Sequence, residues 1–156
     1  GSTGDEDHVK QAVEAHGAVH AWRLAIKPGR PIALGQLGRV PFIGLPGNPA
    51  AVVVTFVMLV RPLIFLLMGG EALPPLSFPV TLGFDYKKKA GRREWVRVFL
   101  RRNEAGQAIA TKFPREGAGI LSSLVECDGL VELPEEVTRL EKGQMADFLP
   151  FSELVR

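Results

Sequence analysis

Two short loops rich in proline and glycine carry the residues of this sequence that are best suited to bind an oxyanion. The first, residues 27–31 (KPGRP), sets Lys27 and Arg30 in a stiff turn, because proline fixes φ and glycine permits a sharp bend. Lysine offers a point charge and arginine a planar fork that suits a tetrahedral oxyanion. Taken alone, such a loop is more often an ordinary turn than a binding site.

The second loop, residues 45–49 (LPGNP), favours the binding interpretation. Asn48 suits a helix N-cap and Pro49 suits the first helical position, so a long apolar helix is expected to start here. Backbone N–H groups at a helix start attract an oxyanion. Two predicted strands, residues 32–37 and 40–45, join the loops through a tight turn, which brings both loops to one side of a sheet.

The segment before these loops predicts a helix followed by a strand. Thr3 and Glu6 form a capping-box pattern for a helix that continues to His16, and residues 18–26 alternate as a strand does. Three acidic residues, at positions 5–7, fall in the first helical turn. They indicate either a well-capped surface helix or carboxylates at the mouth of a site, where they would hold Mg²⁺ or accept hydrogen bonds.

Residues 50–68 are almost uninterrupted apolar sequence, and at 1.5 Å per residue they span roughly 30 Å, enough to cross a bilayer. Arg61-Pro62 lies past the midpoint, and a charge beside a proline is costly in lipid. We therefore expect no membrane span. The interpretation is a central helix of an α/β unit, kinked or split near Val60 by Pro62.

After a Pro-rich stretch at residues 72–75 the pattern becomes all-β. Strands are expected at residues 78–82, 94–102, 107–113, 129–133 and 145–149, which suggests a compact barrel or sandwich. In residues 93–101 the odd positions are basic or aromatic and the even ones are apolar, apart from Glu94. That face could bind single-stranded nucleic acid, lie in solvent or against a subunit, or send an arginine to the anion site of a neighbouring domain.

Composition excludes several classes of function. The chain has 156 residues, a formal net charge of +2, and one cysteine, so neither an intramolecular disulfide nor a multi-cysteine zinc site is available. There is no secretory signal pattern, no Walker-type loop, and no supported Ser/His/Asp or Cys/His arrangement. A cytoplasmic location is expected.

Five motifs in order resemble the C-terminal part of the MoeA family, the molybdopterin molybdenumtransferases related to the gephyrin E domain. They are residues 3–10 (TGDEDHVK), 27–31 (KPGRP), 44–50 (GLPGNPA), 91–98 (GRREWVRV) and 117–124 (GAGILSSL). Each motif is weak alone, but the set covers essentially the whole chain. The resemblance implies a partial doubly wound α/β pterin-binding domain (residues 1–72) followed by a small C-terminal β-barrel-like domain (residues 76–156).

The resemblance also implies an activity: insertion of molybdate into adenylylated molybdopterin with Mg²⁺ and release of AMP. Asp7 would act near the pterin and the metal, and Lys27 and Arg30 would hold molybdate. The other predicted substrate-binding residues are Thr3, Pro31, Pro46, Gly47, Asn48, Pro49 and Arg97. Many family members have serine where this chain has Ala51, which removes one expected molybdate contact.

Two alternatives remain and rank below the enzyme: a basic β-barrel that binds nucleic acid, and a gephyrin-like scaffold. The resemblance places further domains, and the first half of the pterin-binding domain, upstream of Gly1. A parallel sheet without its leading strands would expose apolar faces. We therefore expect the chain alone to be inactive and to cover that surface as a homodimer, by swapping, or with a partner chain.

Overall fold

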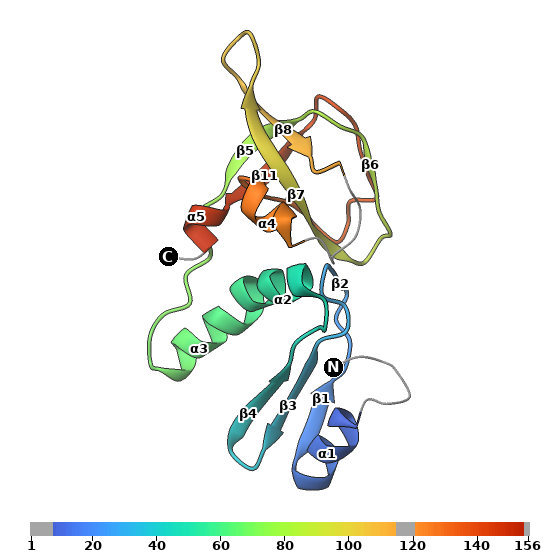
Figure 1. Cartoon of the computed structure of the whole chain (residues 1–156), viewed down its shortest axis with the longest axis vertical. Helices are drawn as coiled ribbons and strands as arrows, with labels where there is room; N and C mark the ends of the chain where they lie inside the picture. The colour runs from blue at the N-terminus through green and yellow to red at the C-terminus, as the bar shows by residue number, and fades with distance from the viewer. Residues whose placement is uncertain (1–7, 115–120, 155–156) are drawn as a thin grey trace.

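A computed structural model describes residues 8–114 and 121–154. Figure 1 shows a β-barrel at one end of the molecule and a small sheet at the other, with a helical run between them. This arrangement confirms the expected class, an α/β portion followed by a small barrel-like portion.

The small sheet has three strands in the order β1-β3-β4, with helix α1 (Val9–His16) packed beside it. Its strands are β1 (Ala18–Ala21), β3 (Ala33–Leu37) and β4 (Val40–Gly44). The predicted tight turn is confirmed, because Leu37 pairs directly with Val40 and Gly38 has φ +59°. Both pairings are antiparallel, so the expected parallel sheet is wrong for the described strands.

The strand predicted over residues 18–26 is interrupted after Ala21. The chain resumes as the two-residue strand β2 (Ile26–Lys27), which leaves the small sheet and pairs in parallel with the barrel strand β7 (Arg93–Arg102). The Leu24 amide meanwhile donates to the Arg30 carbonyl at 3.1 Å, which closes the loop between them. Alternation alone could not show this change of partner, because both halves keep an extended backbone.

The long apolar helix is present as three consecutive segments, α2 (Pro49–Thr55), a π-helical turn η1 (Phe56–Val60) and α3 (Arg61–Leu67). Pro62 has no N–H to donate to the preceding turn, and a π turn is one way in which a helix accommodates such a loss. The predicted disruption near Val60 is therefore confirmed, in the form of a wider turn.

Five strands close the barrel in the order β7-β8-β5-β11-β9, with β9 pairing back to β7. All pairs are antiparallel except β5 with β8. The bounds are β5 (Phe78–Leu82), β7 (Arg93–Arg102), β8 (Ala108–Lys112), β9 (Gly129–Leu133) and β11 (Met145–Pro150), close to the predicted strands. Sequence reasoning missed the short elements β6 (Tyr86–Lys87), β10 (Arg139–Leu140), α4 (Ser122–Glu126) and α5 (Phe151–Leu154).

Two apolar cores hold these parts together. The first fills the barrel, where Val96 and Val98 of β7 pack with Phe148 of β11. The second lies on the outer face of the same wall, where Trp95 and Leu130 pack against Val54 of α2. Strand β7 therefore buries both of its faces, one inside the barrel and one beneath the helix, which fixes the helical run against the barrel.

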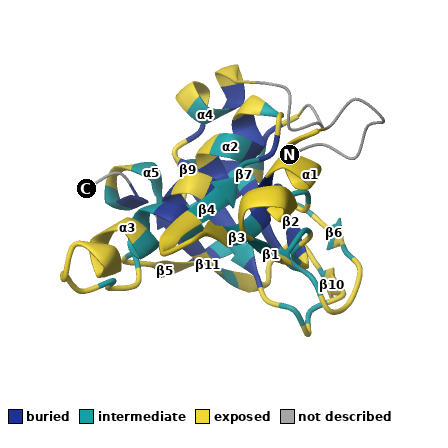
Figure 2. Ribbon diagram, turned by 90° about the horizontal axis from the view of Figure 1, so that it is seen from below, coloured by how far each residue is buried: buried dark blue, intermediate teal, exposed yellow. Residues whose placement is uncertain are grey.

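The helical run is long and apolar enough to cross a membrane by length and composition, a test that core helices also pass. Its first part is buried, and there Val54 and Val57 pack against the barrel residues Trp95 and Leu130. Its last turns are exposed, as the yellow surface of α3 in Figure 2 shows, with Leu66, Leu67 and Met68 all more than half exposed.

The buried face of α2 should contribute measurably to stability. Val54 is fully buried, whereas its neighbour Val53 is 37% exposed. We expect Val54→Ala to lower the free energy of unfolding by about 2 kcal/mol, through lost apolar burial and a residual cavity. Val53→Ala has the same effect on helix propensity and should cost less than about 1 kcal/mol. Urea denaturation followed by circular dichroism measures both, and equal losses would contradict the assigned packing.

Candidate functional site

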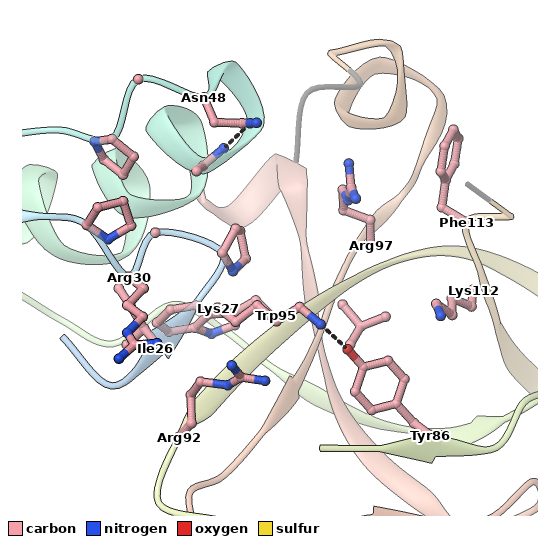
Figure 3. Close-up of a pocket in the computed structure, with 17 residues that line it drawn as sticks. Ile26, Lys27, Arg30, Asn48, Tyr86, Arg92, Trp95, Arg97, Lys112 and Phe113 are labelled. Carbon is pink, nitrogen blue, oxygen red and sulfur yellow. Dashed lines mark hydrogen bonds between the residues drawn. The ribbon is translucent and has the colours of Figure 1, made fainter. Parts of the chain in front are cut away.

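One cavity of about 360 Å³ lies where the two loops meet the outer wall of the barrel. Figure 3 shows the loop residues on one side and Arg97, Lys112 and Phe113 on the other. Five lining residues are cationic, and none of the described lining residues is acidic. The lining comprises Ile26, Lys27, Pro28, Gly29, Arg30, Pro31, Pro46, Gly47, Asn48, Ala51, Tyr86, Arg92, Trp95, Val96, Arg97, Lys112 and Phe113.

The first loop is packed tightly against helix α2. Gly29 has φ +106°, and a Cβ added there would lie 2.1 Å from the Thr55 Cγ2 atom. Only glycine fits both the backbone and the space, so this residue lets the loop sit directly on the helix. Lys27 and Arg30 are exposed on either side of this contact and both line the cavity.

The second loop begins helix α2 as predicted. Asn48 has extended backbone angles and its Oδ1 accepts from the Ala51 amide at 3.5 Å, while Pro49 is the first helical residue. Pro46, Gly47 and Asn48 line the cavity. Pro49 is exposed and outside the lining. Ala51 also lines the cavity, where it presents a methyl group rather than a polar side chain.

Arg97 reaches the cavity from β7, as one of the three interpretations of the basic strand proposed. Its Nη1 donates to the hydroxyl of Ser123, a fully buried residue of α4, and its guanidinium lies 5.8 Å from the centre of the Phe113 ring. Burial lowers the pKa of Arg97 from its ordinary value, although arginine stays charged at neutral pH. The structure therefore brings a partly buried cation to the wall opposite the loops.

Sequence reasoning missed the buried carboxylate beneath this site. Glu94 is 1% exposed and accepts hydrogen bonds from Arg92 and from the Tyr86 hydroxyl, the latter at 2.8 Å. The Lys27 ammonium lies 3.5 Å from the same carboxylate. The motif GRREW contains Arg92 and Glu94, but Tyr86 and Lys112 come from segments whose sequence carries no comparable signal.

The outer face of β7 is not an exposed platform for nucleic-acid bases. Trp95 is only 6% exposed, and its indole N–H donates to Glu132 at 2.9 Å. Arg93 pairs with Glu135, which raises the pKa of Arg93 and lowers that of Glu135, and Arg101 pairs with Asp128. Acidic partners and the helix therefore occupy the face that could have stacked bases.

Two predicted site residues, Thr3 and Asp7, lie outside the described residues, and so does the predicted capping box. Among residues 8–114 and 121–154, no group of three or more His, Cys, Asp or Glu side chains is arranged to hold a metal ion. Glu94, the buried carboxylate that contacts the lining residues Lys27 and Arg92, is already paired with Arg92. The described site therefore fits an anion, and it offers no ligand set for Mg²⁺.

Two family models match the chain. The model described as "MoeA C-terminal region (domain IV)" matches residues 79–151, and the one described as "Probable molybdopterin binding domain" matches residues 1–65. Together they cover most of the sequence.

Relatives with assigned names match over nearly the whole chain. A molybdopterin molybdenumtransferase from Haemophilus influenzae is 36% identical, covering 99% of this chain and 38% of that protein. One from Nostoc sp. is 42% identical, covering 92% and 34%. A crystal structure of a molybdopterin biosynthesis MoeA protein from Pyrococcus horikoshii superposes with a TM-score of 0.68 at 28% identity, over 90% of this chain and 34% of that one. The chain thus spans little more than a third of these relatives.

The contact between Gly29 and Thr55 gives a direct test of how the loop is held. We expect Gly29→Ala to destabilise the chain by more than about 2 kcal/mol, because it combines a positive φ with a steric clash. Gly47→Ala is the matched control, since a Cβ there meets nothing within 4 Å and its φ is not positive. Thermal unfolding monitors both, and an unchanged midpoint for Gly29→Ala would show that the loop is not packed as described.

Proposed function

Because this chain belongs to the MoeA family, we propose that it carries the molybdate-binding part of a molybdopterin molybdenumtransferase, a transferase of molybdenum cofactor biosynthesis. The observation that carries the proposal is the cavity itself, in which cations from the first loop and from the barrel portion converge. The substrate class comes from the names of the relatives, and the cationic lining of the cavity is suited to bind an oxyanion of that class.

The chemistry asked of the described residues is electrostatic. Lys27 and Arg30 flank a rigid loop, and Arg97 faces them from the barrel, so a tetrahedral dianion between them would be approached from two sides. Lys27 and Arg97 are held by hydrogen bonds to Tyr86 and Ser123 before a ligand arrives, which is the condition under which fixed charges stabilise charge developing in a reaction. Pro31, Pro46, Gly47 and Asn48 shape the same wall, and the helix start behind Asn48 favours an anion.

The finer assignment also belongs to this proposal. In it the substrate is adenylylated molybdopterin, AMP is released, and Asp7 and Thr3 contribute near the pterin, with Mg²⁺ held at Asp7. Mg²⁺ would neutralise phosphate charge when bound. The described residues supply none of its ligands, so their part is limited to binding and orienting the oxyanion. Pro49 acts on the second loop by starting the helix, and the domain limits remain those expected, residues 1–72 and 76–156.

The alternatives have less support. A nucleic-acid module would need the aromatic side chains of β7 on its surface, and Trp95 is buried under α2. A scaffold like that of gephyrin would need a partner surface, for which the cavity gives no argument. The proposal also includes a cytoplasmic location and no association with a membrane, as expected for a biosynthetic enzyme of this kind.

Loss of a loop cation should weaken molybdate binding. We expect Lys27→Ala and Arg30→Ala each to raise the dissociation constant for molybdate by about 10- to 100-fold, the range for a lost hydrogen bond to a charged group. Arg39→Ala, at the tip of the β3–β4 hairpin, removes the same charge outside the cavity and is the control. Isothermal titration calorimetry measures all three. The proposal would be refuted if the Lys27→Ala and Arg30→Ala variants bound molybdate as tightly as the parent chain.

The chain by itself should not complete the transfer, because it spans little more than a third of its relatives and its α3 surface is apolar. We propose that this surface is covered in the working enzyme, most simply in a homodimer. The expected result is no release of AMP from adenylylated molybdopterin by the isolated chain, together with self-association in sedimentation velocity. Normal turnover would refute the first expectation, and a well-packed monomer at high dilution the second.

A further inference from the structure

Lys27 is the most exposed member of the network beneath the cavity. Its side chain is 55% exposed, and its ammonium lies 3.3 Å from the Tyr86 hydroxyl oxygen and 3.5 Å from Glu94. A lysine side chain has several rotatable bonds and loses much entropy when it is held in one place. Whatever restrains it before a ligand arrives therefore determines how well it serves as an anion ligand.

Tyr86 restrains the ammonium without neutralising it. Its hydroxyl donates to Glu94 at 2.8 Å, and the hydroxyl oxygen accepts from the Lys27 ammonium. Figure 3 shows the second of these hydrogen bonds as a dashed line. The phenol ring also lies below that ammonium, 5.8 Å from the ring centre, with Lys112 at 5.2 Å from the same centre. Both contacts are with a neutral side chain, and the carboxylate 3.5 Å from the ammonium, Glu94, is already paired with Arg92.

Glu94 is held by a different cation. Arg92 donates to the Oε1 atom of Glu94 through both Nε and Nη2, whereas Tyr86 donates to Oε2. The negative charge of this buried carboxylate is therefore balanced mainly by Arg92. Lys27 also pairs with Glu94 through the backbone, since the two residues are partners in the parallel β2–β7 register.

We propose that Tyr86, aligned by Glu94, is a positioning residue that presents the Lys27 ammonium to an oxyanion in the cavity. This inference rests on the proposed function, because it takes molybdate as the ligand. It assigns a role to a residue from the barrel portion of the chain, 59 residues away in sequence from the lysine that it positions.

The effect of removing the Tyr86 hydroxyl on molybdate affinity separates a positioning role from a purely electrostatic one. Removing the Tyr86 hydroxyl leaves the formal charge of the cavity unchanged, so a purely electrostatic account predicts no change in affinity. A positioning role predicts weaker binding, and only while Lys27 is present. Tyr86→Phe keeps the ring, and with it the packing against Phe84 in the barrel.

A double-mutant cycle on this chain tests the inference with molybdate as the probe. We expect Tyr86→Phe to raise the dissociation constant about 3- to 10-fold in the parent, and to have no further effect in Lys27→Ala. In the control background Arg30→Ala, the loss from Tyr86→Phe should be undiminished. The thermal midpoint of each variant checks that the fold is intact.

The outcomes distinguish this inference from the proposed function. An equal loss from Tyr86→Phe with and without Lys27, or no loss at all, overturns the positioning role while molybdate binding through Lys27 and Arg30 still stands. If the parent binds no molybdate, or if Lys27→Ala and Arg30→Ala leave its affinity unchanged, the proposed function fails and the positioning role fails with it.

Discussion

The parallel pairing of β2 with β7 is the constraint on which the candidate site depends. Only two residues of β2 take part, and they place Lys27 opposite Glu94. Together with the packing of Gly29 on helix α2, this short pairing fixes the first loop relative to the barrel wall that carries Arg97 and Lys112. Side-chain contacts stabilise this junction between the first loop and the barrel as well. The buried carboxylate of Glu94 contacts the side chains of Lys27, Tyr86 and Arg92.

Positive charges outnumber negative charges around this junction, which favours the binding of an anion. Five cations line the cavity, and Glu94 lies beneath it, paired mainly with Arg92. A buried carboxylate without a partner would be costly, and a loop lysine held directly by a carboxylate would be a poorer anion ligand. Arg92 and Tyr86 supply the hydrogen bonds to Glu94, which leaves the Lys27 ammonium at a longer distance of 3.5 Å from this carboxylate. The cavity therefore keeps an excess of positive charge that an oxyanion can offset.

Local chemistry explains which parts of this arrangement could be predicted from the sequence. Proline, glycine and asparagine determine backbone geometry within a few residues, so the KPGRP turn, the helix start at Asn48 and the disruption before Pro62 were all predictable. Alternation likewise revealed the barrel strands. Tyr86 and Glu94 were not identified as site residues, because their roles arise from pairing between distant segments. Alternation put Trp95 on the outer face of β7, but no local signal showed that helix α2 covers it.

The residues that stabilise the molecule and those proposed to bind its ligand are interleaved on helix α2. Ala51 lines the cavity, Val54 lies in the core against the barrel, and Thr55 packs against Gly29 of the loop. Val54 and Thr55 lie three and four residues after Ala51, so all three share one side of the helix. The packing of this helix face therefore acts together with the β2–β7 pairing to set the separation between the loop and the barrel wall. Changes in that packing should reach the cavity without altering any residue that lines it.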